Sequence, residues 1–67
     1  MSVARVTEII SSSTTSFEDA IQKGVARAVK TLKNVEGAWI KEQKIVVDGG
    51  KIAEYRVDLK VTFILTD

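Results

Sequence analysis

The sequence predicts an α+β fold of order β-α-β-β, in which a three-stranded antiparallel sheet, ordered 1-3-2, wraps around one helix. An apolar stripe at helical spacing over residues 17–32 predicts the helix, and alternation with period two over residues 51–66 predicts the last strand. The turn Asp48-Gly49-Gly50 returns the chain antiparallel. A right-handed crossover through the helix leaves room for the third strand between the first two. The longest strand is therefore expected at the centre of the sheet.

Residues 3–10 are rich in β-branched side chains and predict the first strand. The hydroxyl run that follows, residues 11–15, is expected to end this strand and to lead into the helix. Thr15 with a glutamate three residues later, or Ser16 with an aspartate three residues later, fits a capping box. The helix is therefore expected to begin at this point.

The predicted helix covers about eighteen residues at the usual spacing of an amphipathic segment. Gly24 lies in the middle of its apolar stripe, where glycine lowers helix stability by about 1 kcal/mol relative to alanine. Ala20 and Ala28 flank it at the same face, so the three small residues favour a close approach of the sheet. The stripe consists of Phe17, Ala20, Ile21, Gly24, Val25, Ala28, Val29 and Leu32.

The second and third strands are predicted over residues 35–47 and 51–66. The third strand alternates between an apolar face, expected to contact the helix, and a charged face. The apolar face consists of Tyr55, Val57, Leu59, Val61, Phe63 and Leu65. The hairpin is expected to place Gln43 near Arg56, Lys41 near Asp58 and Trp39 near Lys60.

The third strand is too long for the helix that should cover it. At about 3.3 Å per residue it spans roughly 50 Å, whereas the helix at 1.5 Å per residue spans roughly 27 Å. About half of the apolar face therefore lacks a cover from its own chain. The natural cover is another copy, so the sequence predicts an obligate homo-oligomer.

Composition excludes several classes of function. The chain has 67 residues, is expected to form a single domain over residues 1–67, and lacks both Cys and His. Disulfides, Cys/His zinc sites, thiol nucleophiles and imidazole bases are excluded, and no carboxylate pair has an acid/base arrangement, so we predict no enzyme. The net charge of +1 gives no basic field for nucleic acid. No segment has signal or membrane length, so we expect a cytoplasmic protein without membrane contact.

The charged face also carries the single tryptophan, Trp39. This residue fits, in order of preference, an interface anchor, a stacking platform for a ligand, or a bulky residue on a half-buried strand. The charges nearby fit either a solvated surface with weak cross-strand pairs or the lining of an interior or subunit interface. Those charges are Glu54, Arg56, Asp58 and Lys60.

The element order, the hydroxyl-rich turn before Phe17-Glu18-x-Ala20-Ile21, and the segment Glu54-Tyr55-Arg56-Val57-x-Leu59-x-Val61-x-Phe63 together resemble the dodecin family over nearly the whole chain. This resemblance implies a non-enzymatic hollow sphere of twelve identical subunits. It also implies storage or quenching of flavins (riboflavin, FMN or FAD), bound in pairs on the sheet face. Its partners would be its own copies and a small-molecule ligand.

The resemblance also implies where a flavin would bind. The family's stacking tryptophan, hydrogen-bonding glutamine and nearby acid fall on Gly37, Arg56 and Glu42, so the acid alone is retained. Trp39 lies two residues from Gly37, roughly 7 Å along the same face, and offers a stacking surface in a shifted pose. The resemblance therefore implies weak flavin binding or none.

The combination of Tyr55-Arg56 with Glu42-Gln43 is similar to a second branch of the family, the calcium dodecins. Calcium takes six to eight oxygen ligands, and the chain has no Asp-x-Asp-x-Asp-Gly loop. An ion site would have to be assembled by symmetry from single acids such as Glu54 or Asp58 of several subunits. The alternative to flavin binding is therefore a calcium-binding or purely structural cage.

Overall fold

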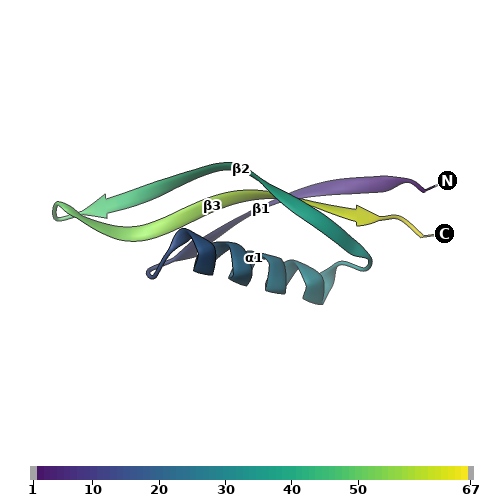
Figure 1. The fold of residues 1–67 in the computed structure, drawn as a ribbon, viewed down its shortest axis with the longest axis horizontal. Helices are drawn as coiled ribbons and strands as arrows, with labels where there is room; N and C mark the ends of the chain where they lie inside the picture. Colours follow the sequence, from purple (N-terminus) through teal and green to yellow (C-terminus); the bar gives the residue numbers. More distant parts are fainter. Residues whose placement is uncertain (1, 67) are drawn as a thin grey trace.

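The structure is a computed structural model that describes residues 2–66. The chain forms strand β1 (Ala4–Ser13), helix α1 (Phe17–Thr31), strand β2 (Val35–Asp48) and strand β3 (Lys51–Ile64). The strands make one antiparallel sheet of order β1-β3-β2, and α1 lies on one of its faces (Figure 1). The predicted fold class and strand order are confirmed.

The prediction that the hydroxyl run ends the first strand is wrong, because β1 continues through Ser13. Ser11 pairs with Val57 of β3 and lies beneath α1. A Cβ atom built on Gly24 of the helix would meet the Ser11 Cβ at 3.1 Å. The close approach of α1 therefore requires a small residue in β1 at this point, and tertiary packing overrides the low strand propensity of serine.

Ser16, rather than Thr15, caps the helix. Its Oγ accepts a hydrogen bond from the backbone N–H of Asp19 at 3.0 Å. The Asp19 carboxylate pairs with Lys23 at 2.8 Å and accepts a hydrogen bond from the buried Ser13 hydroxyl at 2.6 Å. The hydrogen bond from Lys23 has the largest effect on the pKa of Asp19, and together with the bond from Ser13 it lowers this pKa. These two bonds also join the end of β1 to the start of α1.

The helix is shorter than predicted and ends at Thr31 after 15 residues. Leu32 already has extended backbone angles, and its N–H donates to the Ala28 carbonyl at 2.9 Å. Asn34 then adopts a φ of 60°, in the left-handed region that asparagine tolerates better than most residues. This turn directs the chain into β2.

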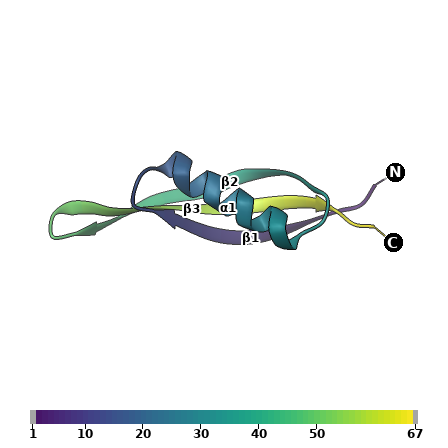
Figure 2. The ribbon, with the colours of Figure 1, turned by 90° about the horizontal axis from the view of Figure 1, so that it is seen from below.

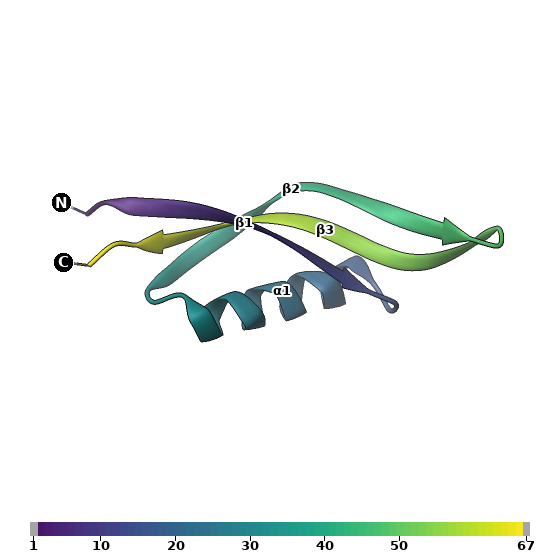
Figure 3. The same cartoon turned by 180° about the vertical axis from the view of Figure 1, so that it is seen from behind.

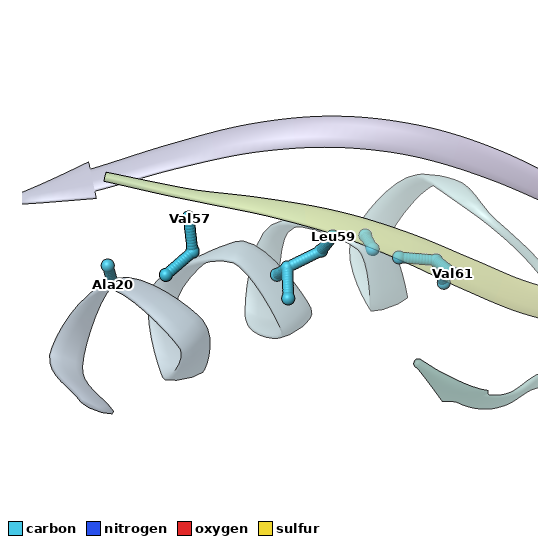
Figure 4. Close-up of a cluster of buried hydrophobic side chains, with 5 residues drawn as sticks. Ala20, Val57, Leu59 and Val61 are labelled. Atoms are coloured by element: carbon cyan, nitrogen blue, oxygen red, sulfur yellow. The ribbon is translucent and has the colours of Figure 1, made fainter. Parts of the chain in front are cut away.

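The core lies between α1 and the middle of β3 (Figure 4). Its fully buried side chains come from the small residues of the helix stripe and from the predicted apolar face of the strand. At one end of the core, the Phe17 and Tyr55 rings meet edge to face with centroids 5.2 Å apart. The buried hydrophobic residues are Ala20, Ala28, Val57, Leu59 and Val61.

The sheet extends well beyond the helix. The molecule measures 50 × 19 × 13 Å, whereas the fifteen residues of α1 span roughly 22 Å. The β2–β3 hairpin projects past the first turn of α1, and the two termini lie together beyond its last turn (Figures 1 and 3). The mismatch in length that the sequence predicts is therefore present in the structure.

The third strand ends at Ile64, two residues before the predicted end. The backbone N–H of Leu65 still donates to the Val3 carbonyl at 2.8 Å. The Leu65 side chain is 46% exposed, so the last member of the predicted apolar face lies outside the core.

Candidate functional site

The sheet face turned away from α1, here called the polar face, carries all four predicted flavin-site positions. On β2 and β3, Gly37 lies opposite Thr62, Trp39 opposite Lys60, Glu42 opposite Asp58, and Lys44 opposite Arg56. Strand β1 adds Glu8, Ile10 and Ser12 opposite Lys60, Asp58 and Arg56.

A β-bulge in β2 changes the predicted pairing. Trp39 does lie opposite Lys60, as predicted, but the pairings of Lys41 with Asp58 and of Gln43 with Arg56 are wrong. The register shifts by one residue between Ile40 and Glu42, so Gln43 lies opposite Val57 of the helix-facing set. An extra residue in one strand moves the side chains that follow it to the other face. A second shift, between Val46 and Val47, restores the register next to the turn. The bulge therefore brings Glu42 to the polar face in place of Gln43.

An acid pair joins β1 to β3 on this face. The pKa of Asp58 is raised, first by its hydrogen bond with Glu8, then by desolvation and by the Glu8 charge. The pKa of Glu8 is lowered, chiefly by the same hydrogen bond and also by the charges of Lys41 and Lys60. Lys41 Nζ lies 3.5 Å from Glu8 Oε2. The two acids therefore share a proton as the pair titrates, and Asp58 keeps it to higher pH than Glu8 does.

Replacing Asp58 with asparagine should remove a pH-dependent part of the stability. Because its folded-state pKa is raised, Asp58 contributes stability that is present below its ordinary value of 3.8 and is lost as the pH rises through the raised pKa. The Glu8 contribution has the opposite sign and is lost as the pH falls below 4.5. Asparagine donates to Glu8 without a titrating proton. Urea midpoints measured above pH 4.5, where the Glu8 contribution is complete, should fall with rising pH in the parent chain and fall less in Asp58→Asn.

Glu8→Gln provides the comparison for this experiment. It removes the anion that holds the Asp58 proton, so the decline of the urea midpoint with rising pH should weaken here too. An unchanged decline in both variants would contradict the shared proton.

The four predicted flavin-site residues line two different cavities. Glu42 and Arg56 line a small cavity of about 130 Å³ on the polar face, together with Ile10. Gly37 and Trp39 belong to the edge strand β2, and they also border a larger cavity of about 580 Å³ between α1 and β2. Small-molecule sites usually have about 300 Å³ or more. The polar-face cavity of one chain is therefore too small for a three-ring ligand.

The side chains around these cavities differ in their availability. Trp39 is 49% exposed and free to contact a ligand or another copy. Arg56 Nη2 lies 3.1 Å from Glu54 Oε1. A small molecule that binds to the Arg56 guanidinium therefore has to compete with the Glu54 carboxylate. Sequence reasoning missed Glu8, whose place on the charged face follows from period-two alternation in β1.

The two acids proposed for calcium are not brought together within one chain. Glu54 pairs with Arg56, and Asp58 with Glu8. Among residues 2–66, no three acidic side chains lie close enough together to hold a metal ion. In the same part of the chain, no helix is long and apolar enough to cross a membrane.

Comparisons with known proteins agree with this fold. The calcium dodecin of Mycobacterium tuberculosis is 38% identical over 63 residues, covering 94% of this chain and 89% of that protein. The dodecin of Thermus thermophilus is 34% identical over 65 residues, covering 97% of this chain and 94% of that protein.

Solved structures extend the similarity to three dimensions. The dodecin from Streptomyces davaonensis superposes with a TM-score of 0.93 at 33% identity, covering 98% of this chain and 97% of that one. The M. tuberculosis calcium dodecin, described as calcium-chelating with a novel calcium-binding site, superposes with a TM-score of 0.83 over 96% of this chain and 91% of that one. The Dodecin family model matches residues 3–66. The chain is therefore a member of the dodecin family.

Proposed function

We propose that this chain assembles into a closed shell of twelve copies that binds a small ligand without catalysing a reaction. The observation that carries this proposal is the apolar surface that α1 leaves uncovered. Ile45, Val47 and Ile52 of the β2–β3 hairpin are each 44–59% exposed. A chain of 67 residues has few other means of burying such surface. Family membership supports the closed shell, and a cytoplasmic location stays a prediction.

The proposed ligand is a flavin held between copies on the polar face. The 130 Å³ cavity beside Glu42 and Arg56 is too small within one chain, so a second copy has to complete the site. Trp39 supplies an aromatic surface, and Arg56 supplies hydrogen-bond donors for the flavin edge. Gly37 supplies no ring where the family has its stacking tryptophan. We therefore expect weaker flavin binding than the family pattern provides.

Flavin titration of two variants tests the ligand. A stacked aromatic ring contributes about 1–3 kcal/mol, which corresponds to about 5- to 150-fold in affinity. Trp39→Ala should therefore weaken riboflavin or FMN binding by this factor. Gly37→Trp should strengthen it, since nothing lies within 4 Å of a Cβ atom at Gly37. Quenching of flavin fluorescence measures both affinities, and unchanged affinity in both variants would exclude stacking at these positions.

Calcium is the second candidate ligand. Asp58 Oδ1 is buried and has no hydrogen-bond partner in the structure, and the M. tuberculosis relative is a calcium dodecin. One chain would provide Asp58 and Glu8, so the remaining oxygen ligands have to come from other copies. Calorimetric titration with Ca²⁺ should then give a binding heat that Asp58→Asn removes. A purely structural cage would bind neither calcium nor flavin.

A further inference from the structure

We propose that the tip of the β2–β3 hairpin of one copy inserts into the groove between α1 and β2 of the next copy. The hairpin tip is defined by Ile45, Val47 and Ile52, and the helix–strand groove by Ile21, Val25, Val29, Ala38 and Ile40. This inference rests on the proposed assembly and identifies the contact that builds it.

The helix–strand groove is an apolar cavity without a cover in its own chain. It has a volume of about 580 Å³, and Leu59 and Val61 of β3 also line it. Helix α1 crosses the sheet diagonally (Figure 2), and its packing against β2 is much less extensive than against β1 and β3. Val29 and Ile40, which lie on the two walls of the groove, are 56% and 43% exposed. Its aliphatic lining therefore favours an aliphatic occupant.

The hairpin tip has the matching chemistry and cannot fill the groove of its own chain. The β2–β3 hairpin that carries its three aliphatic side chains projects past the first turn of α1, at one end of the 50 Å axis (Figure 3). Strands β2 and β3 run without a break from the tip into the sheet beside the groove, so the tip cannot fold back. A second copy therefore has to supply the tip that enters the groove.

Charge also favours a second copy as the occupant. The groove is lined by Glu36, whereas the tip carries two lysines, Lys44 and Lys51, against one acid, Asp48, beside its aliphatic residues. Opposite charges would therefore meet at the rim of the contact. The tip and the groove are different surfaces, so the contact is heterologous. If the rotation that relates one copy to the next returns to the first copy, the copies form a closed ring. In such a ring every tip and every groove is occupied.

Cysteine cross-linking tests the contact, because the chain has no cysteine of its own. Val29→Cys marks the groove and Val47→Cys marks the tip. Treating the double variant with a short bis-maleimide should convert the monomer band on a denaturing gel into covalent oligomers. The matched control combines Val47→Cys with Arg27→Cys, on the other side of α1 facing β1, and should keep its monomer band. Each single variant serves as a further control.

The native mass, measured by light scattering before cross-linking, separates the two levels of the proposal. An assembled protein that cross-links through Arg27→Cys, or through neither helix position, overturns the hairpin contact and leaves the shell standing. A native mass of 7.4 kDa overturns the shell itself. Val47→Asp adds a second test, since Val47 is 59% exposed in one chain. It should lower the native mass below that of the parent chain, and full assembly would contradict the contact.

Discussion

Val61→Asp is expected to lower the free energy of unfolding by about 3–5 kcal/mol, the usual effect of a buried charge without a partner. Val61 is 1% exposed, and its neighbours across the two ladders are Thr7 and Ala38, neither of which carries a positive charge to pair with a carboxylate. Urea unfolding at a fixed protein concentration measures the loss. Because small domains have about 5–15 kcal/mol of stability, assembly should fail together with folding.

Leu65→Asp provides the control, since Leu65 belongs to the same alternation but is 46% exposed and lies beyond β3. Its effect on stability should be within about 0.5 kcal/mol. Phe63→Asp tests the intermediate position, because Phe63 is half-buried and closer to the uncovered end. It should lower the assembly state and the stability together. A soluble, well-folded monomer from Val61→Asp or Phe63→Asp would contradict obligate assembly.

Gly24→Val is expected to destabilise the protein by about 1–3 kcal/mol, although valine has the better helix propensity. A Cβ atom at Gly24 would lie 2.9 Å from Leu59 Cδ1 and 3.1 Å from Ser11 Cβ, and valine adds two further carbons. The helix would have to move away from β1 and β3. Thermal unfolding monitored by circular dichroism measures the change.

Gly37→Val is the matched control, because nothing lies within 4 Å of a Cβ atom at Gly37. Valine favours strands, so this variant should unfold at the parent temperature or above it. Combining Gly24→Val with Leu59→Ala should give a smaller loss than the sum of the two single changes, because alanine makes room for the added carbons. Strict additivity would show that the contact between positions 24 and 59 does not cause the loss.

Strong periodicity made the elements predictable, and tertiary packing set their ends. The stripe from Phe17 and the alternation through Val57, Leu59 and Val61 predict the core that the structure contains. Ser11 was misplaced because its role depends on Gly24, a residue of another element. No local propensity carries that information.

The pairing of the hairpin was predictable except between two register shifts, one between Ile40 and Glu42 and one between Val46 and Val47. Trp39 was placed correctly opposite Lys60, but the extra residue before Glu42 leaves no mark in a pattern of period two. Trp39 therefore lies on the predicted face because the predicted register holds there, whereas Glu42 lies on it because the register has shifted. The site also depends on Glu8 of β1, which meets Asp58 and Lys41 only once the sheet has formed.

The native mass of the purified chain tests whether the uncovered hairpin and groove are covered by other copies. Light scattering coupled to gel filtration at micromolar concentration should give one species with twelve times the mass of the 7.4 kDa chain. A single species at 7.4 kDa, with its helix and strands intact, would contradict the proposed shell, the shared ligand site and the hairpin contact together.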